Sequence, residues 1–101
     1  DEVARCAAEA GEAFWPMPLP EHLRAALESP FAALRNTDMS SRAGGMLVAG
    51  LFLREFVGDV PWAHLDIAGP AYNEKSAWGA TPVGGTGAGL ATLVALLSGR
   101  A

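Results

Sequence analysis

The sequence has one cysteine, few charged residues and no long apolar run, and each scarcity excludes a class of protein. Cys6 has no partner for an internal disulfide, which suits a reducing cytoplasm, and its place among alanines predicts a buried, inert thiol. Lysine and arginine number 7 against 11 aspartates and glutamates, and the formal charge of −4 argues against a nucleic-acid surface. The longest apolar run, Met46–Leu53, is too short to span a bilayer. No basic stretch followed by an apolar one opens the sequence, so we expect no signal peptide.

The length of 101 residues bounds the chain to one domain, which buries roughly two-thirds of the surface of its unfolded form. Apolar residues make up 50% of it, a high share for a small free-standing domain. Two explanations stay open: abundant alanine, or apolar surface that belongs against another chain or a missing part of this one. The chain begins inside a helical pattern without an initiator methionine, as a piece of a longer protein or a processed chain would.

Apolar spacing predicts two helices in the first third of the chain. The first covers residues 1–10, with Asp1 as its N-cap and Gly11 as the residue that ends it. The second begins at Pro20, which suits a first helical turn, and ends before Ser29-Pro30. Between them, residues 14–20 carry a proline at alternate positions near their end. We interpret them as an extended strap that buries Trp15 and Leu19.

Two further helices are predicted downstream. One runs from Ser40 or Ser41 to about Phe56, and its apolar residues cover nearly all faces, so it should be buried. Its glycines lower helix propensity, from which we infer that another element approaches closely. The last helix is capped by Thr86 and ended by Gly99. Its apolar face consists of residues at helical spacing: Leu90, Leu93, Val94 and Leu97.

Residues 62–68 are the clearest strand pattern in the chain. Alternate side chains of a strand point to opposite faces, so Ala63, Leu65 and Ile67 form an apolar side, which lies opposite His64 and Asp66. Gly69-Pro70 ends the pattern, and a loop follows to Gly85. Ligands of open α/β sheets gather at the carboxyl ends of strands, which favours residues 68–73 as part of a binding site.

The same stretch carries a family resemblance. It reads W-A-H-L-D-I-A-G over residues 62–69, after an apolar helix that ends in F-L-R-E-F, and it accompanies G-E-A-F-W-P-M-P-L at 11–19 and G-A-T-P at 79–82. These motifs resemble the carboxyl-terminal end of the leucyl aminopeptidases, the cytosol aminopeptidase family, over nearly the whole chain. The resemblance implies an α/β fold with helices packed on a mostly parallel or mixed sheet, of which residues 1–101 form a C-terminal segment.

What the family does follows from the resemblance alone. It implies a cytoplasmic homohexamer that removes amino-terminal residues from peptides with two divalent metal ions, zinc or manganese, one binding the free amine and both activating water. Its partners would be peptide substrates, the remainder of the same enzyme and other hexamer subunits. The corresponding substrate-pocket residues are Ala68, Gly69 and Ala71 on the amino-terminal side, and Asp38 and Met39 on the leaving side. The family often has a bulkier residue such as Met at the position of Ala71, so this pocket should admit larger apolar side chains such as Leu, Met or Phe.

A segment at 36–42 imitates the family's metal-binding motif. That motif reads N-T-D-A-E-G-R, and here N-T-D-M-S-S-R keeps Asp38 and Arg42 but has Ser40 in place of the glutamate. Loss of a carboxylate leaves a divalent ion short of charge and ligands. The distance from Arg42 to the 62–69 motif also matches a later, non-catalytic part of the family. We therefore expect no metal ligand and no catalytic residue in this chain, and the segment alone should be inactive.

Two weaker candidates remain. His64 and Asp66 share one strand face and would suit a metal or an acid–base pair, but buried hydrogen bonds are the more ordinary role. Residues 84–89 are glycine-rich before a helix, yet they follow no strand and lack a P-loop lysine, which favours a helix-entry loop over a phosphate site. No serine lies in a G-x-S-x-G turn.

Two function classes compete. The first is the non-catalytic segment of a two-metal aminopeptidase that supplies core and pocket wall. The alternative is a stand-alone interaction module that binds a partner through the proline-rich strap and the 70–85 loop. A nucleotide-binding module is a third, weaker hypothesis. A single strand makes no sheet, so missing strands would have to come from elsewhere, which favours the first.

Overall fold

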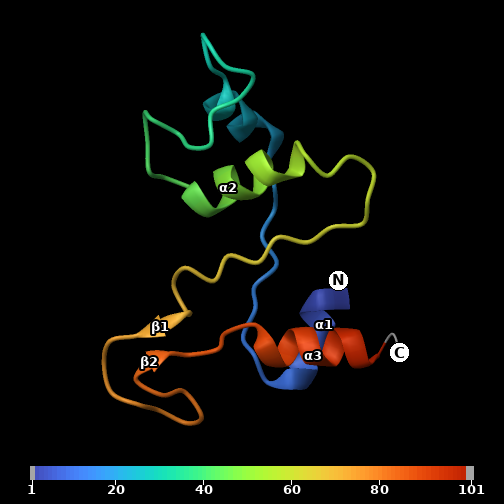
Figure 1. Cartoon of the computed structure of the whole chain (residues 1–101), viewed down its shortest axis with the longest axis vertical. Coiled ribbons are helices and arrows are strands. Elements are labelled where there is room, and N and C mark those ends of the chain that lie inside the picture. Colours follow the sequence, from blue (N-terminus) through green and yellow to red (C-terminus); the bar gives the residue numbers. More distant parts are fainter. Residues whose placement is uncertain (1, 100–101) are drawn as a thin grey trace. The chain divides into compact units, whose positions relative to one another are not determined.

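A computed structural model describes residues 2–99, which form two compact units. The first unit contains the described residues of 1–16 and 65–101, and the second contains residues 17–64 (Figure 1). The first holds helices α1 (Glu2–Ala10) and α3 (Leu90–Ser98) and strands β1 (Tyr72–Asn73) and β2 (Gly84–Gly85). The second holds the 3-10 helix η1 (Glu21–Leu27) and helix α2 (Gly45–Arg54). The chain therefore combines helices with a two-stranded sheet, which fits an α/β fold broadly.

Helix α1 ends on Gly11, as the sequence predicts. Gly11 has φ +76°, its N–H donates to the carbonyl of Ala8 at 3.2 Å, and the N–H of Glu12 donates to the carbonyl of Ala7 at 2.9 Å. This pair of bonds is a Schellman motif, in which a left-handed glycine lets the chain turn back over the helix end. The predicted N-cap, Asp1, lies outside the described residues.

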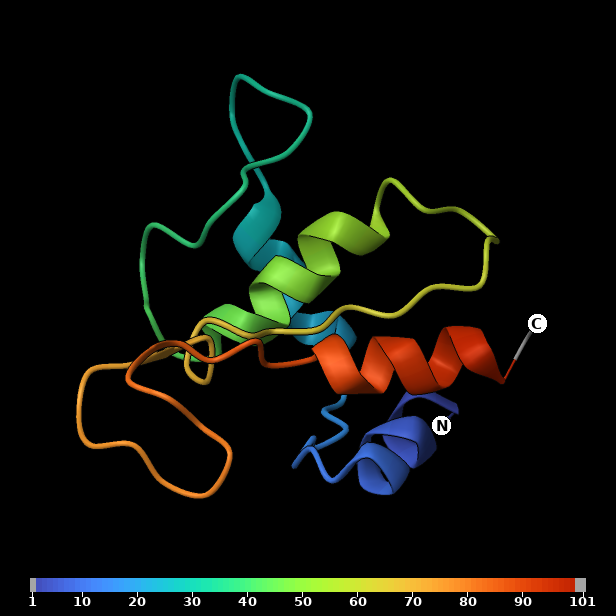
Figure 2. The ribbon, with the colours of Figure 1, turned by 60° about the horizontal axis from the view of Figure 1, so that its bottom comes forward.

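In the first unit α1 packs against α3, and the two helices lie side by side in both views (Figure 1, Figure 2). Cys6 and Ala7 of α1 are 3% and 1% exposed, which confirms the buried thiol. The buried residue of α3 is Thr92. The predicted apolar face of α3 points away from α1.

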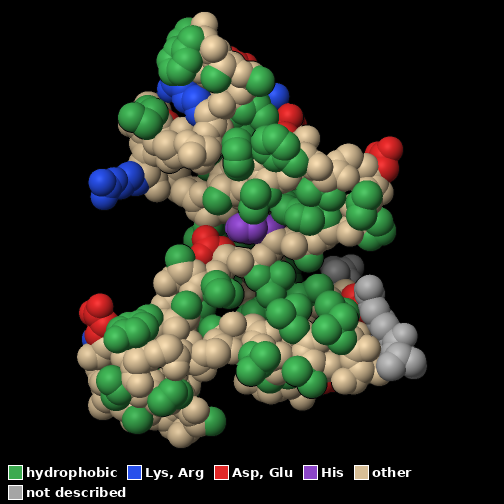
Figure 3. All heavy atoms as spheres, in the orientation of Figure 1, with side chains coloured by type: hydrophobic (Ala, Val, Ile, Leu, Met, Phe, Trp, Pro, Cys, Tyr) green, Lys and Arg blue, Asp and Glu red, His purple; other side chains and the backbone are tan. Residues whose placement is uncertain are grey.

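That face is largely exposed among the described residues. Leu90, Val94 and Leu97 are 65%, 57% and 66% exposed, and Leu93 is 44% exposed. Helical spacing shows that a face is apolar, but what covers it depends on a partner surface that residues 2–99 do not supply. Figure 3 shows hydrophobic side chains gathered at the surface of the helical part of this unit.

The second unit is held by a small core between η1 and α2. Leu27, Val48 and Leu51 are buried, and Leu19, Leu23 and other half-buried apolar residues pack around them. The predicted second helix is present in 3-10 form and begins after Pro20, whose φ of −71° prepares the first turn. Two ion pairs tie η1 to α2, Arg24 with Glu55 at 2.9 Å and Arg54 with Glu21 at 2.7 Å.

Helix α2 begins at Gly45, and its N-cap lies three or four residues later than the predicted N-cap, Ser40 or Ser41. Ser40 and Ser41 belong to a turn organised by Asp38, and Gly44 in left-handed conformation at φ +66° takes the N-cap position. Met46 and Leu53 are 48% and 42% exposed, so the prediction of burial on nearly all faces is wrong for the described residues.

The glycines of α2 do allow a close approach, at one position. A Cβ added to Gly50 would lie 3.0 Å from Leu19 Cδ2 and 3.6 Å from His64 Cδ2, whereas one added to Gly45 would meet nothing within 4 Å. The inference from the glycines is therefore confirmed at Gly50, where a Cβ would lie in tight contact with the side chain of Leu19.

The predicted strand at 62–68 forms no ladder. A strand is defined by a hydrogen-bonded neighbour, and in the described part of the chain only β1 and β2 pair, antiparallel, with Tyr72 opposite Gly85. The 70–85 loop is thus a small hairpin, with a further bridge between Trp78 and Thr81. The strand prediction fails because alternation reports which side chains share a face and says nothing of which segment pairs with them.

The proline-rich segment follows the prediction at one end only. Leu19 packs against the core of the second unit, but Trp15 is 84% exposed. The expected burial of Trp15 is wrong for the described residues. None of the helices among residues 2–99 has the length and apolar character needed to cross a membrane.

Candidate functional site

The first candidate surface is the turn at residues 67–71, which follows the W-A-H-L-D-I-A-G motif. The N–H of Ala71 donates to the carbonyl of Ile67 at 2.9 Å, and the N–H of Ala68 donates to Asp66 Oδ1 at 3.0 Å. Asp66 is exposed and acts as the acceptor of a local Asx turn. The turn brings together the three pocket residues predicted on the amino-terminal side, Ala68, Gly69 and Ala71.

Thr86 holds this turn from the opposite strand of the hairpin. Its N–H donates to the carbonyl of Ala71 at 3.0 Å, and its hydroxyl donates to the carbonyl of Pro70 at 2.5 Å. The same oxygen accepts the N–H of Ala88 at 3.3 Å. Thr86 is therefore not the N-cap of α3 as predicted. That position belongs to Gly89, at φ +88°, because the chain makes one more turn before the helix begins.

Gly89 offers no side chain to cap α3, and Glu12 supplies the missing acceptor. Glu12 Oε1 accepts the N–H of Gly89 at 2.8 Å, and Glu12 Oε2 accepts the N–H and the hydroxyl of Thr92. The hydrogen bond from the Thr92 hydroxyl is the main cause that lowers the pKa of Glu12 below 4.5. The backbone N–H groups of Thr92 and Gly89 add to it, and partial burial opposes it.

The Glu12 carboxylate also occupies the backbone donors at the end of the glycine-rich loop. The N–H groups of Gly89 and Thr92, which a phosphate would need, are already bound to Glu12. The helix-entry interpretation of residues 84–89 agrees with this geometry. The role of Glu12 is not predicted from the sequence, although a glycine at an N-cap signals that an acceptor must come from elsewhere.

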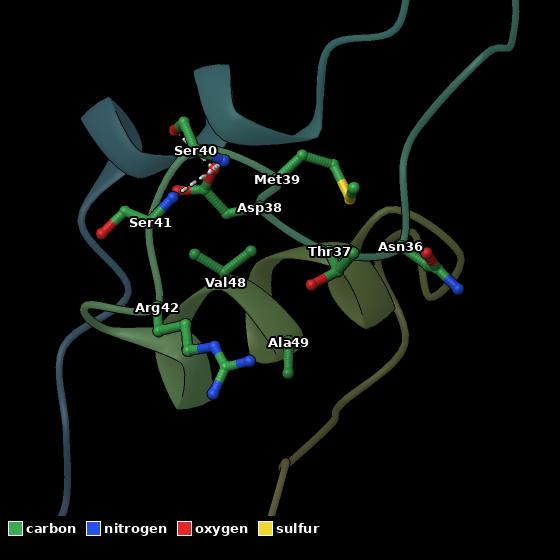
Figure 4. A pocket seen from close by; sticks show the side chains of 10 residues that line it. Asn36, Thr37, Asp38, Met39, Ser40, Ser41, Arg42, Val48 and Ala49 are labelled. Atoms are coloured by element: carbon green, nitrogen blue, oxygen red, sulfur yellow. Dashed lines mark hydrogen bonds between the residues drawn. The ribbon is translucent and has the colours of Figure 1, made fainter.

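The second candidate surface is a hollow in the second unit, formed by residues 36–42 with Gly45, Val48 and Ala49 of α2 (Figure 4). Asp38 and Met39, the residues predicted on the leaving side, both line it. Met39 is 75% exposed. Figure 4 shows Arg42 extending along α2 while Asp38 turns back to Ser40 and Ser41.

The carboxylate of Asp38 accepts hydrogen bonds within its own turn. Asp38 Oδ1 accepts the N–H and the hydroxyl of Ser40, both at 2.7 Å, and the N–H of Ser41 at 3.3 Å. The Ser40 hydroxyl is the main cause that lowers the pKa of Asp38, and the N–H groups of Ser40 and Ser41 add to it. Ser40 and Ser41 therefore hold Asp38 in a structural role here.

His64 and Asp66 each interact within their own segment. Asp66 fixes the turn at Ala68, as described above, while the His64 ring stacks on Trp62 with 6.2 Å between ring centroids. His64 Nε2 is buried and finds no hydrogen-bond partner among residues 2–99. The expected buried hydrogen bonds are thus not formed by either residue in the described chain. Across residues 2–99, no three His, Cys, Asp or Glu side chains gather closely enough to hold a metal ion.

The comparison with protein families assigns the class. The model of the cytosol aminopeptidase family, catalytic domain, matches residues 1–94, and the chain belongs to this family. It corresponds to the carboxyl-terminal portion of that domain. The motifs at 11–19 and 62–69, which carry the hydrogen bonds of Glu12 and the turn at Ala71, lie inside the matched region.

Individual relatives bear the same name. The chain is 61% identical over 95 residues to a probable cytosol aminopeptidase of Streptomyces avermitilis and 55% identical over 98 residues to one of Mycobacterium ulcerans. These matches cover 93% and 96% of this chain but 18% and 19% of the relatives, so the chain spans about a fifth of their length.

A solved structure shares the fold. The bottromycin maturation enzyme BotP matches 98% of this chain at a TM-score of 0.90 and 42% identity, and the chain covers 22% of it. The same enzyme in complex with Mn matches at a TM-score of 0.85. The family is a family of metal-dependent peptidases.

Proposed function

We propose that residues 1–101 form a C-terminal segment of the catalytic domain of a two-metal aminopeptidase that removes amino-terminal residues from peptides. The observation that carries the proposal is the 61% identity, over 93% of the chain, to a probable cytosol aminopeptidase. In this proposal the remainder of the polypeptide supplies the other strands of a mostly parallel or mixed sheet. Residues 62–68 then pair with one of those strands, which explains their alternation.

The segment contributes core and pocket wall, and the two metal ions, zinc or manganese, are held by other residues of the polypeptide. Support comes from residues 36–42, which lack the glutamate of the family's metal-binding motif and in which Asp38 accepts a hydrogen bond from Ser40. A relative solved in complex with Mn supports the choice of metal. The segment alone is proposed to be inactive.

The substrate contacts divide between the two candidate surfaces. Ala68, Gly69 and Ala71 form the wall of the pocket for the amino-terminal side chain. Four hydrogen bonds hold their turn: the N–H of Ala68 donates to Asp66, the N–H of Ala71 donates to Ile67, and Thr86 donates to both Pro70 and Ala71. Asp38 and Met39 face the leaving side of the peptide. The short side chain of Ala71 leaves room for Leu, Met or Phe.

The apolar surplus fits an assembly. We place the protein in the cytoplasm as a homohexamer, in which the exposed faces of α2 and α3 are covered by the remainder of the polypeptide or by neighbouring subunits. Leu97 and Met46, at 66% and 48% exposure, are the side chains that this cover would bury.

The test uses the complete polypeptide that carries these residues. Native mass spectrometry should show an assembly of several subunits, and Mn²⁺ or Zn²⁺ should support cleavage of leucyl substrates. A chelator should abolish the cleavage and added metal should restore it. A complete polypeptide that stays monomeric, binds neither metal and cleaves no leucyl substrate would contradict the proposal.

The exposure of Trp15 supports a second candidate, a stand-alone interaction module. Trp15 in the proline-rich segment is 84% exposed and Trp78 in the 70–85 loop is 69% exposed, and exposed aromatics of this kind anchor protein partners. In this case Trp15→Ala would abolish partner binding by a monomeric chain. If the chain is instead a segment of an aminopeptidase, the isolated chain should bind no such partner, and Trp15→Ala should change nothing.

A further inference from the structure

We infer that Thr86 is a positioning residue for the proposed pocket, and that it sets the preference for the substrate's amino-terminal side chain by fixing the Pro70–Ala71 turn. This inference rests on the proposed function, since the turn carries the pocket wall only if the protein is an aminopeptidase. Thr86 contacts no substrate in this scheme. It acts through the two carbonyl groups to which it donates.

Two hydrogen bonds from one residue converge on adjacent carbonyls. The N–H of Thr86 reaches the carbonyl of Ala71 at 3.0 Å, and its hydroxyl reaches the carbonyl of Pro70 at 2.5 Å. Two bonds to neighbouring peptide groups fix the plane of the peptide between them, whereas one bond would leave it free to rotate. The position of the Ala71 Cβ follows from the orientation of that peptide.

The turn itself has few other restraints. Pro70 has no N–H to donate, and the N–H of Ala71 closes the turn on the carbonyl of Ile67 at 2.9 Å. The next residue, Tyr72, pairs with Gly85 in a ladder of two residues. So short a ladder is marginally stable by itself. The side chain of Asn73 adds hydrogen bonds to the carbonyls of Ser76 and Pro82 within the loop, and the hydroxyl of Thr86 donates at the Pro70–Ala71 turn.

Thr86 is itself held from the helix side. Its oxygen accepts the N–H of Ala88, and the next residue, Gly89, is bound by Glu12 at 2.8 Å. Gly87, which lies between Thr86 and Ala88, has φ +71°, a conformation that lets the chain turn from the hairpin into α3. The restraint on Ala71 therefore passes back to the anchored start of a helix and does not end in a mobile loop.

The expected effect is on preference rather than on the chemical step. Thr86→Val keeps the shape and β-branching but removes the hydroxyl, which leaves the Pro70 carbonyl without its donor and loosens the wall. A looser wall discriminates less between side chains. We expect the ratio of kcat/KM for Phe over Ala substrates to move about threefold to tenfold toward unity, mostly through KM.

Matched variants separate positioning from damage. Thr86→Ser keeps the hydroxyl and should retain the wild-type ratio. Thr81→Val makes the same replacement in the same loop, where only the backbone of Thr81 is hydrogen-bonded among the described residues, and should leave the ratio unchanged. If Thr86→Val does not fold, Thr86→Ala removes the hydroxyl without adding a methyl group to the site.

The experiment measures kcat and KM for Ala, Leu and Phe substrates with the metal-loaded complete polypeptide, and hydrogen exchange of residues 67–73. A shifted ratio and faster exchange in Thr86→Val, restored in Thr86→Ser, support the inference. An active wild type whose valine variant keeps both the ratio and the exchange rates overturns the inference alone. A wild type that cleaves none of the substrates with either metal overturns the proposed function, and the specificity role with it.

Discussion

Glu12 and Thr92 lie 80 positions apart in the chain, and one carboxylate oxygen of Glu12 accepts both the N–H and the hydroxyl of Thr92. The other oxygen accepts the N–H of Gly89. In a capping box two side chains share these tasks at a helix start, one binding the third N–H and one binding the N-cap N–H. Here a single residue at the end of α1 does both for α3, whose own N-cap is a glycine.

Replacement of Glu12 should therefore destabilise the first unit. Glu12→Gln keeps the size but removes the charge and one acceptor, and loss of such a cap costs about 1–2 kcal/mol of unfolding free energy. Urea denaturation of the 101-residue chain measures it. Glu9→Gln is the control, because Glu9 lies on the exposed surface and pairs only locally with Arg5. Equal stability of the two variants would contradict the role of Glu12.

The contribution of Glu12 should also depend on pH. Its pKa in the folded state is lowered from 4.5, chiefly by the Thr92 hydroxyl, so the carboxylate holds its proton less tightly when folded than when unfolded. The stabilisation is then complete above that ordinary value and is lost as the pH falls through the lowered one. The stability difference between wild type and Glu12→Gln, measured between pH 7 and pH 3, should shrink in acid. A difference that stays constant would contradict the assignment.

Two glycines of α2 should respond oppositely to alanine. Gly45→Ala adds a Cβ into open space and should stabilise the chain by up to about 1 kcal/mol through helix propensity. Gly50→Ala gains the same propensity but places its Cβ 3.0 Å from Leu19 Cδ2, so strain offsets the gain. Gly50→Val should be destabilising by about 1–3 kcal/mol. Denaturant midpoints of the three variants decide, and equal midpoints would mean that Leu19 and His64 move aside freely.

The apolar face of α3 should behave differently in the short chain and in the complete polypeptide. Leu97 is 66% exposed among the described residues, so Leu97→Ser should change the stability of the 101-residue chain by less than about 0.5 kcal/mol. In the complete polypeptide, where we propose that this face is covered, the same change should cost about 2 kcal/mol or more. Melting temperatures of both forms give the comparison. A loss of stability seen only in the 101-residue chain would contradict the proposal that this face is covered.

The size of Ala71 should set the upper limit of the substrate pocket. Ala71→Met fills the proposed space and should lower kcat/KM for Phe substrates more than for Ala substrates, by about tenfold for each 1.4 kcal/mol of lost binding. Steady-state kinetics of the metal-loaded complete polypeptide measures both. Equal losses for the two substrates would exclude Ala71 from the pocket wall.

Local signals in the sequence predict the structure well, and non-local ones do not. Gly11 was found because a helix end depends on a few neighbouring residues, and Cys6 because its burial follows from one helical face. Residues 62–68 find no pairing partner among residues 2–99, and a pattern of alternation does not show which segment would pair with them. The same holds for the apolar face of α3, and for Glu12, whose contacts join residues at opposite ends of the chain.

The candidate site divides in the same way. The turn after the 62–69 motif was expected as a ligand-facing position, and the hollow at 36–42 contains the two residues predicted for it. The hydrogen bonds from Thr86 to the turn are not predicted from the sequence, because a helix N-cap is the usual role of a threonine in that position. Its actual partners, the carbonyls of Pro70 and Ala71, lie 16 and 15 residues upstream.

The junction at Gly11 and Glu12 ends one helix and begins another, because the backbone N–H of Glu12 closes α1 while its side chain starts α3. An inserted or deleted residue there would rotate the carboxylate away from Gly89 and break both helix ends at once. The tip of the hairpin between β1 and β2 carries no such double duty. Insertions and deletions among members of this family should accordingly occur in the hairpin and be absent from the junction, because the junction sets the spacing of α1 and α3.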